Sequence, residues 1–255
     1  MILSTRLLPA VRAAGIHFLC SLIVASFAAA LVFGLWYPYP YTKLSGGREL
    51  FLLVVSVDVI CGPILTLVLF NPKKPKNELL RDLGLVALIQ LGALGYGLQT
   101  VWQVRPLFLV QEVDRFKVIA RPAVDGVLLA SLPAALQPGW TSGPITVAIR
   151  EPKDGEERKT VMFESVAGGR DYAERPNFYL PYEGKDALKS LKAAKPLSVF
   201  LKRRPDQQAA AEKLAIDKKI DLTPLLYLPV VGRQDWIAVL DKQGQIQGFL
   251  QGDGF

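Results

Sequence analysis

The sequence predicts a membrane protein: three transmembrane α-helices followed by a periplasmic α+β domain. Three observations lead to this fold class. The first 104 residues contain three apolar stretches of roughly 20 residues, and at about 1.5 Å per residue each matches a hydrocarbon core about 30 Å thick. No stretch of residues 105–255 is comparably long and apolar. Basic residues are also unevenly distributed among the segments that flank the apolar stretches.

The three stretches cover residues 15–36, 50–70 and 83–104. Each is apolar all round, as a transmembrane helix is, whereas helices of soluble domains carry an apolar stripe. We therefore expect residues 1–104 to form a membrane anchor and residues 105–255 a separate domain. The third stretch also predicts close helix packing, because one face is mostly small and a small pair lies nearby. The face holds Gly84, Ala87, Gly95 and Leu98, and the pair is Ala93 and Gly97.

Loop charges predict the orientation. Six basic residues lie in the first terminus and the second loop, against two in the first loop. By the positive-inside bias, the terminus and the second loop are cytoplasmic and the domain after the third helix is outside. The six residues are Arg6, Arg12, Lys73, Lys74, Lys76 and Arg81, and the two are Lys43 and Arg48.

The first stretch has a second interpretation as a cleaved signal peptide, because residues 28–30 are a run of alanines. The apolar sequence continues to Trp36, which favours an uncleaved helix, and the domain is outside in either case. The aromatic residues that follow predict an interfacial belt. They are Trp36, Tyr37, Tyr39 and Tyr41.

The net charge of +7 does not predict nucleic-acid binding. Residues 105–255 hold 22 basic and 19 acidic side chains, which leaves only 22 − 19 = +3 on the domain. The other +4 lies in the first 104 residues, where it serves topology beside the lipid bilayer.

The domain lacks the side chains that most often carry catalysis. His17 is the only histidine, and the two cysteines, Cys20 and Cys61, lie in apolar stretches at different depths, so they are expected to pack rather than to pair. Residues 105–255 therefore contain no Ser-His-Asp triad, no cysteine nucleophile and no usual zinc site. We expect no cofactor, no metal and no enzymatic activity, although carboxylate or Ser-Lys chemistry stays open.

The domain reads as α+β. We expect a long strand over residues 107–120, then strands over 145–150 and 160–166 separated by a charged turn region. Helices are expected over 185–194 and 206–219, the second with Asp206 as its N-cap. Strands over 225–231, 236–241 and 245–250 follow, the last two joined by a turn at residues 242–244.

Asp58 is the residue of the second stretch that most needs an explanation. It lies about 12 Å below the outer interface, where a carboxylate costs about 2.5–3.5 kcal/mol on insertion scales. Counting along the third stretch puts Tyr96 and Gln99 near its depth. Three roles stay open for Asp58: a hydrogen bond to one of these two residues, contact with a partner membrane protein, or a proton relay. Pro63, after Gly62, is expected to kink or loosen the same helix.

The run Val-Asp-Val-Ile-Cys-Gly-Pro-Ile-Leu-Thr-Leu, residues 57–67, resembles the VD-x-x-x-GP-x-LTL signature of type IV pilin accessory proteins of the TfpX/TfpZ type. Residues 36–38, 113–116, 168–171 and 175–176 agree with the same family, and so does the layout of a three-helix anchor with an exported tail. The resemblance covers most of the chain but weakens after Lys185.

The resemblance implies a chaperone-like protein of the inner membrane that binds a major type IV pilin and assists its stability, pilus assembly and pilus dynamics. Other proteins of the pilus assembly platform are further partners that it suggests. Two rival functions stay open: a membrane-anchored periplasmic enzyme, and a transporter or sensor subunit that uses Asp58. Three lysines of the domain recur at helical spacing and form a candidate docking face for acidic surfaces, or else a solvated helix face. They are Lys185, Lys189 and Lys192.

Overall fold

The computed structural model describes residues 2–255, with side chains from Arg6 onward. The chain divides into two compact units. The helical unit comprises Met1–Pro38 and Gly47–Gln103, and the sheet unit comprises Tyr39–Gly46 and Val104–Phe255. The loop between the first two long helices therefore belongs to the sheet unit, although it lies within residues 1–104, the predicted membrane anchor. As a result the chain passes three times from one unit to the other.

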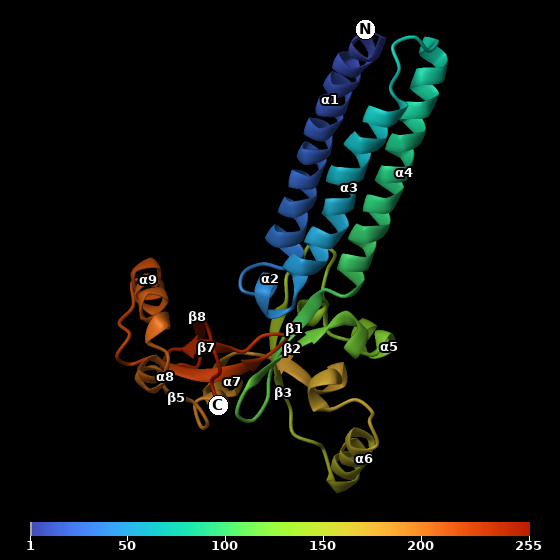
Figure 1. The fold of residues 1–255 in the computed structure, drawn as a ribbon. Helices are drawn as coiled ribbons and strands as arrows, with labels where there is room; N and C mark the ends of the chain where they lie inside the picture. Colours follow the sequence, from blue (N-terminus) through green and yellow to red (C-terminus); the bar gives the residue numbers. More distant parts are fainter. Residues whose placement is uncertain (1) are drawn as a thin grey trace. The chain divides into compact units, whose positions relative to one another are not determined.

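The helical unit contains three long helices, as predicted (Figure 1). They are α1 (Ile2–Leu31), which continues into a π-helical turn (Val32–Trp36), α3 (Gly47–Leu69) and α4 (Lys76–Gln103). Each is long and apolar enough to cross a membrane. All three begin before the predicted ranges, and α3 and α4 each end one residue before the predicted end.

The second of these helices, α3, packs against both α1 and α4. At one end, Phe33 stacks edge-on against Phe51 with ring centroids 4.9 Å apart, and the Tyr37 hydroxyl donates to the Val101 carbonyl over 3.1 Å. At the other end, the Arg6 guanidinium donates to the Val68 carbonyl over 2.7 Å. Contacts between different helices therefore join them at both ends of the helical unit.

The predicted aromatic belt is largely wrong. Trp36 and Tyr37 are 3% and 1% exposed and belong to the core of the helical unit. Tyr41 is buried in the sheet unit, and only Tyr39 is widely exposed. Three of the four rings therefore pack inside the protein: Trp36 and Tyr37 in the core of the helical unit, and Tyr41 in the core of the sheet unit.

The sheet unit is built on one mixed sheet in the order β4-β3-β1-β2-β6-β7-β8, with the two-residue β5 paired to β6. The pairs β1–β3 and β2–β6 are parallel and the others antiparallel. The α+β class is thus as predicted. The strands are β1 (Pro106–Gln111), β2 (Phe116–Ala120), β3 (Ile145–Ile149), β4 (Tyr179–Pro181), β5 (Lys195–Pro196), β6 (Leu226–Val231), β7 (Trp236–Leu240) and β8 (Ile246–Gln251).

Short helices surround this sheet. Phe200 of α8 and Ala211 of α9 are fully buried against apolar side chains of β6, β7 and β8. A second core lies around β1 and β3, where the Phe108 and Tyr179 rings are 4.8 Å apart. The helices are α2 (Tyr41–Leu44), α5 (Gly126–Ala130), α6 (Gly155–Val166), α7 (Gly184–Ser190), α8 (Leu197–Arg203) and α9 (Gln208–Lys218).

The loop Tyr39–Gly46 fills a place in the core of the sheet unit. Leu44 is completely buried, and its carbonyl accepts the Arg233 backbone N–H over 2.7 Å. A Cβ at Gly232 would come within 2.8 Å of that same carbonyl, so only glycine permits the close approach. Tyr39 also lies edge-on to Trp236, with centroids 5.9 Å apart. A loop of eight residues is therefore fixed to the β6–β7 turn.

Two strand predictions were wrong. Residues 107–120 form the hairpin β1–β2 and not one long strand, because residues 112–115 turn the chain. Residues 160–166 belong to helix α6. Asp154 caps that helix by accepting the Glu157 backbone N–H over 2.8 Å, and Glu157 pairs with Arg150. These local bonds fix a helix start that the apolar pattern of 160–166 did not reveal.

The predicted helices of the domain were correct in place but not in extent. The first, α7, ends at Ser190 rather than Ala194. The second, α9, begins at Gln208, and Asp206 does not cap it. The Asp206 carboxylate instead binds the Arg204 guanidinium over 2.7 Å. The last three predicted strands are confirmed as β6, β7 and β8, with the expected turn between β7 and β8.

Candidate functional site in the helical unit

Two polar residues meet at the midpoints of their helices. Asp58 is the middle residue of α3 and Gln90 lies at the middle of α4. The Gln90 side-chain amide donates to the Asp58 backbone carbonyl over 2.8 Å. If these helices span a bilayer, the contact lies near its centre, where polar groups carry their largest cost and mark functional positions.

The sequence motif around Asp58 builds this contact. Asp58, Gly62 and Thr66 recur every fourth residue and so share one face of α3. A Cβ at Gly62 would overlap the Gln90 side-chain amide, so the glycine leaves the space that Gln90 occupies. Pro63 has no N–H for the carbonyl four residues before it, which loosens the turn that contains Asp58 and Gly62. The motif thus leaves room for the Gln90 side chain to reach the backbone of α3.

The third residue of this face contacts α1. His17 Nδ1 lies 2.5 Å from the Thr66 hydroxyl oxygen, and Thr66 is only 2% exposed. Neither His17 nor Gln90 was singled out from the sequence as a contact between helices. The signal for both was available, because each is a polar residue within an apolar helix.

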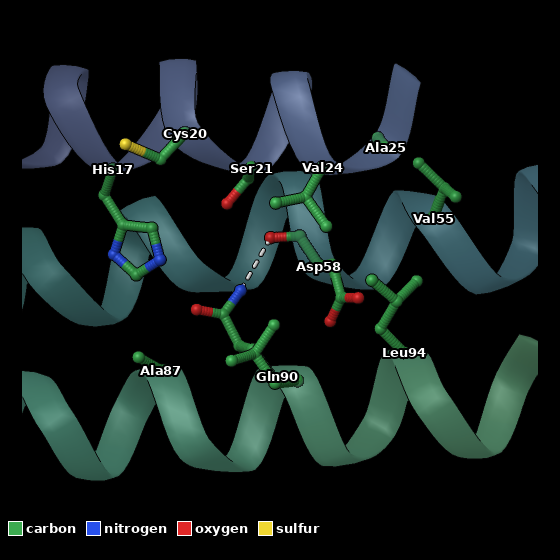
Figure 2. A pocket seen from close by; sticks show the side chains of 11 residues that line it. His17, Cys20, Ser21, Val24, Ala25, Val55, Asp58, Ala87, Gln90 and Leu94 are labelled. Atoms are coloured by element: carbon green, nitrogen blue, oxygen red, sulfur yellow. Dashed lines mark hydrogen bonds between the residues drawn. The ribbon is translucent and has the colours of Figure 1, made fainter. Parts of the chain in front are cut away.

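A cavity of about 160 Å³ lies beside these residues (Figure 2). All three helices contribute to its lining, and the side chains of Asp58 and Gln90 border it together with the Ser21 hydroxyl. The Asp58 Oδ2 and Gln90 Oε1 atoms are buried and have no hydrogen-bond partner among residues 2–255. The lining residues are His17, Cys20, Ser21, Val24, Ala25, Val55, Asp58, Ala87, Gln90, Leu91 and Leu94.

The expected partners of Asp58 lie elsewhere. Tyr96 is 75% exposed and Gln99 is also exposed, and the buried carboxylate oxygen of Asp58 bonds to neither. The predicted hydrogen bond was therefore wrong, because α4 turns Gln90 toward α3 and turns Tyr96 away. Cys20 borders the cavity, Cys61 is exposed, and both are free thiols.

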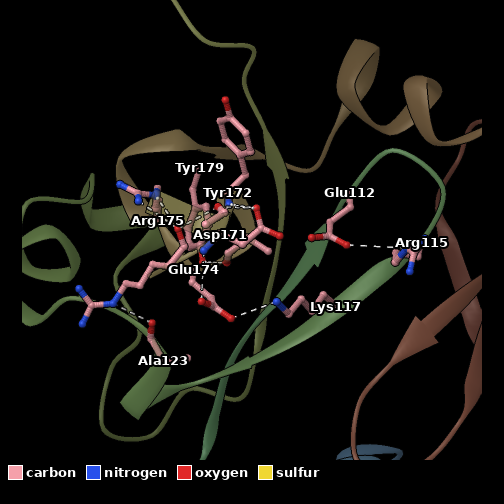
Figure 3. Close-up of polar contacts among 12 residues, drawn as sticks. Glu112, Arg115, Lys117, Ala123, Asp171, Tyr172, Glu174, Arg175 and Tyr179 are labelled. Carbon is pink, nitrogen blue, oxygen red and sulfur yellow. Dashed lines mark hydrogen bonds and ion pairs between the residues drawn. The ribbon is translucent and has the colours of Figure 1, made fainter. Parts of the chain in front are cut away.

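A charged network in the sheet unit lies next to two of the segments on which the family resemblance rests, residues 113–116 and 168–171 (Figure 3). Lys117, on β2, pairs with Glu174 over 3.0 Å. Glu174 also accepts the Asp171 backbone N–H over 3.3 Å, which closes a capping box. Burial, and then the charges of Asp171 and Asp114, raise the pKa of Glu112 against the opposing pull of Lys117 and Arg115. These contacts fix the β1–β2 turn to the segment after α6.

The lysines of the candidate docking face do not form one helical stripe. Lys185 is exposed at the start of α7, and Lys189 pairs with Asp186 over 2.8 Å. Lys192 lies beyond the end of α7. Across the part of the chain that the structure describes, no group of three or more His, Cys, Asp or Glu side chains is placed to hold a metal ion.

Comparison with known proteins decides the family. The family model described as fimbrial assembly protein FimB matches residues 5–46, which cover most of α1 and all of the loop Tyr39–Gly46. Over 257 aligned positions the chain is 37% identical to the fimbrial assembly protein of Dichelobacter nodosus serogroup I, covering 98% of each chain. This chain belongs to the fimbrial assembly protein family.

Two further relatives support the assignment. The serogroup E1 protein of Dichelobacter nodosus is 36% identical, again over 98% of both chains. The protein of serogroups C1 and C2 is 42% identical over 130 residues, which are 51% of this chain and 97% of that relative. No solved structure matches this fimbrial assembly protein. The type IV pilin accessory family that the sequence resembles is consistent with these matches.

Proposed function

We propose that this fimbrial assembly protein is an inner-membrane accessory protein that binds a major type IV pilin and assists its stability, its assembly into the pilus and pilus dynamics. The observation that carries the proposal is the similarity, over 98% of both chains, to proteins named for fimbrial assembly. The role needs no catalysis, and residues 105–255 contain neither histidine nor cysteine.

In this proposal the helical unit spans the membrane and residues 105–255 are periplasmic. Three helices of sufficient length and apolarity support the spanning, and the basic residues of the first terminus and the second loop support the orientation. The loop Tyr39–Gly46 belongs to the sheet unit, so it has to lie on the same side of the membrane as that unit. This agrees with the charge-based topology, in which both are outside.

Detergent extraction tests the function. An affinity-tagged copy of this protein, expressed in a host that makes type IV pili, should retain the major pilin through purification. Deletion of the gene should reduce surface pili and lower the pilin level in the membrane. Absence of pilin from the purified sample, together with normal piliation of the deletion strain, would refute the proposal.

Cysteine labelling tests the topology. In a variant without Cys20 and Cys61, single cysteines at exposed positions of the sheet unit, such as Lys213 or Gln243, should react with an impermeant thiol reagent in spheroplasts. A cysteine at Lys73 should react only after lysis. The reverse labelling pattern would overturn the topology.

The cavity beside Asp58 also supports a second candidate, a proton-coupled subunit of a larger membrane assembly. Asp58→Asn separates the two functions, since the amide keeps the shape but cannot carry a charge. Loss of piliation with intact pilin binding would favour the proton-coupled role. Unchanged piliation would eliminate it.

A further inference from the structure

We infer that the cavity beside Asp58 is part of a groove that binds a transmembrane helix of a partner protein, and that this helix carries a hydrogen-bond donor near its middle. The inference rests on the proposed function, in which the partner is a membrane-embedded pilin. It assigns the contact to one face of the helical unit.

The three helices form a groove with α3 at its base and α1 and α4 at its sides. Helix α3 packs against α1 and against α4, whereas α1 and α4 have little contact with each other. The cavity lies where the three helices face a common space, with Ser21 and Val24 from α1, Asp58 from α3 and Ala87 from α4 (Figure 2). Leu91 of α4 also lines it. A helix laid between α1 and α4 would therefore rest on the central part of α3.

The chemistry of the cavity calls for a donor. Asp58 Oδ2 and Gln90 Oε1 are both buried acceptors without a partner among the described residues. The Gln90 amide already donates to the Asp58 backbone carbonyl, and a hydrogen bond joins His17 Nδ1 to the Thr66 hydroxyl. The Ser21 hydroxyl borders the cavity but bonds to neither free acceptor. A lipid acyl chain can fill apolar space but has no group to donate. Since an unbonded polar atom in hydrocarbon is costly, a partner with a hydroxyl, amide or ammonium group fits this position best.

The wall formed by α4 permits a close approach. Gly84 and Gly95 are eleven residues apart, about three turns, so they share one side of the helix next to Ala87 and Leu91. A Cβ added to either glycine would meet nothing within 4 Å. Small residues without internal contacts let the backbone of a second helix come near, and a helix satisfies its own backbone hydrogen bonds in lipid.

A second copy of this chain suits the groove less well. At the level of the cavity, the lipid-exposed hydroxyls of its own helices are those of Ser26 and Ser56. Both donate to carbonyls of their own helices, over 2.8 and 3.0 Å. Tyr96 does expose a hydroxyl-bearing side chain, but it lies six residues from Gln90, about 9 Å along the helix axis.

Filling the groove tests the inference. Ala87→Trp places an indole in the cavity, and we expect at least tenfold less pilin to co-purify with the full-length protein in detergent. Ala93→Trp is the matched control, because Ala93 is exposed, does not line the cavity and points about 120° away around α4. Capture by this control should stay within twofold of wild type. Equal capture by both variants, high or low, would overturn the inference.

Cysteine crosslinking provides a second measurement that does not depend on the tryptophan variants. In a chain without Cys20 and Cys61, Ser21→Cys should crosslink in membranes to single cysteines near the middle of the pilin helix. Ile89→Cys, on the far side of α4, should not. A product of two copies of this chain from Ser21→Cys, or no product, would reject the partner helix. If wild-type protein captures no pilin at all, the proposed function itself fails, which is a different result from capture that ignores the groove.

Discussion

The Gln90 side chain donates to the backbone carbonyl of Asp58 over 2.8 Å and so joins the midpoints of α4 and α3. The contact is possible because Gly62, one turn further along α3, has no side chain. The Asp58 carboxylate takes no part in it and is left facing the cavity. Backbone and side chain of the same residue therefore have separate roles: the carbonyl holds the helices together, and the carboxylate is available to a partner.

Gly62→Ala should loosen the contact between α3 and α4. The new methyl group overlaps the Gln90 amide, which must move and lose its hydrogen bond, and overpacking of this kind costs about 1–3 kcal/mol. Unfolding of the detergent-solubilised protein with increasing SDS measures the loss. Gly84→Ala is the control, since open space surrounds Gly84 and no loss is expected. Because Gly→Ala by itself favours the helix, similar losses in both variants would mean that the Gln90 contact does not decide the outcome.

Thr66→Val should weaken the contact between α1 and α3. It removes the hydroxyl that faces His17 at nearly constant shape, and hydrogen bonds between membrane helices contribute about 0.6–2 kcal/mol. Thr100→Val is the matched control, because the Thr100 hydroxyl donates within its own helix to the Tyr96 carbonyl. SDS-induced unfolding should shift for the first variant and much less for the second. A larger shift for Thr100→Val would contradict the assignment.

Leu44→Ala should destabilise the sheet unit. Leu44 is fully buried among residues of β6 and β7, and truncating such a leucine costs about 2–5 kcal/mol. Amide hydrogen exchange on the full-length protein should speed up in β6, β7 and β8 and leave the α3 amides unchanged. The neighbouring Lys43→Ala, at an exposed position, should alter neither region. Unchanged exchange in the Leu44 variant would show that the loop is not a part of that core.

Glu157→Gln should reduce stability in a pH-dependent way. The Arg150 guanidinium and the Lys153 backbone N–H lower the pKa of Glu157 to about 2. A lowered pKa stabilises the folded state above the ordinary carboxyl pKa of 4.5, and this contribution disappears as the pH falls toward 2. The melting temperature of wild type should therefore exceed that of the variant at pH 7, and the gap should narrow below pH 4.5. Glu156→Gln, one residue earlier and exposed, should show no such trend.

The sequence predicted well what depends on long patterns. Three apolar stretches of sufficient length give three helices, and the apolar runs of residues 225–250, with a turn at residues 242–244, give three antiparallel strands. It predicted poorly what depends on single local bonds. Residues 160–166 were expected to form a strand, but the Asp154 cap begins helix α6 there. Asp206 was expected to cap the next helix, but its carboxylate pairs with Arg204.

The candidate site was half predicted. Asp58, Gly62 and Pro63 were singled out because a carboxylate and a proline are unusual in a transmembrane helix. Their true partner, Gln90, was missed because depth alone does not say which way a helix is rotated about its axis. Tyr96 and Gln99 lie near the depth of Asp58 along the helix, but both side chains are exposed and so do not face α3. The packing of Gln90 onto Gly62 decides that rotation, and it needs both helices in place.

The loop Tyr39–Gly46 has a consequence for the order of events during synthesis. Leu44 is made early, but its binding site at Val230, Gly232 and Trp236 emerges about 190 residues later, which at common translation rates is roughly 10–40 s. During that interval the loop has to wait, already exported in the proposed topology, with Tyr41 and Leu44 unprotected. The sheet unit can therefore close only when nearly the whole chain has been made. A chain that ends before β6 and β7 cannot bury Leu44, so its loop stays exposed. Burial of Leu44 therefore distinguishes complete molecules from incomplete ones.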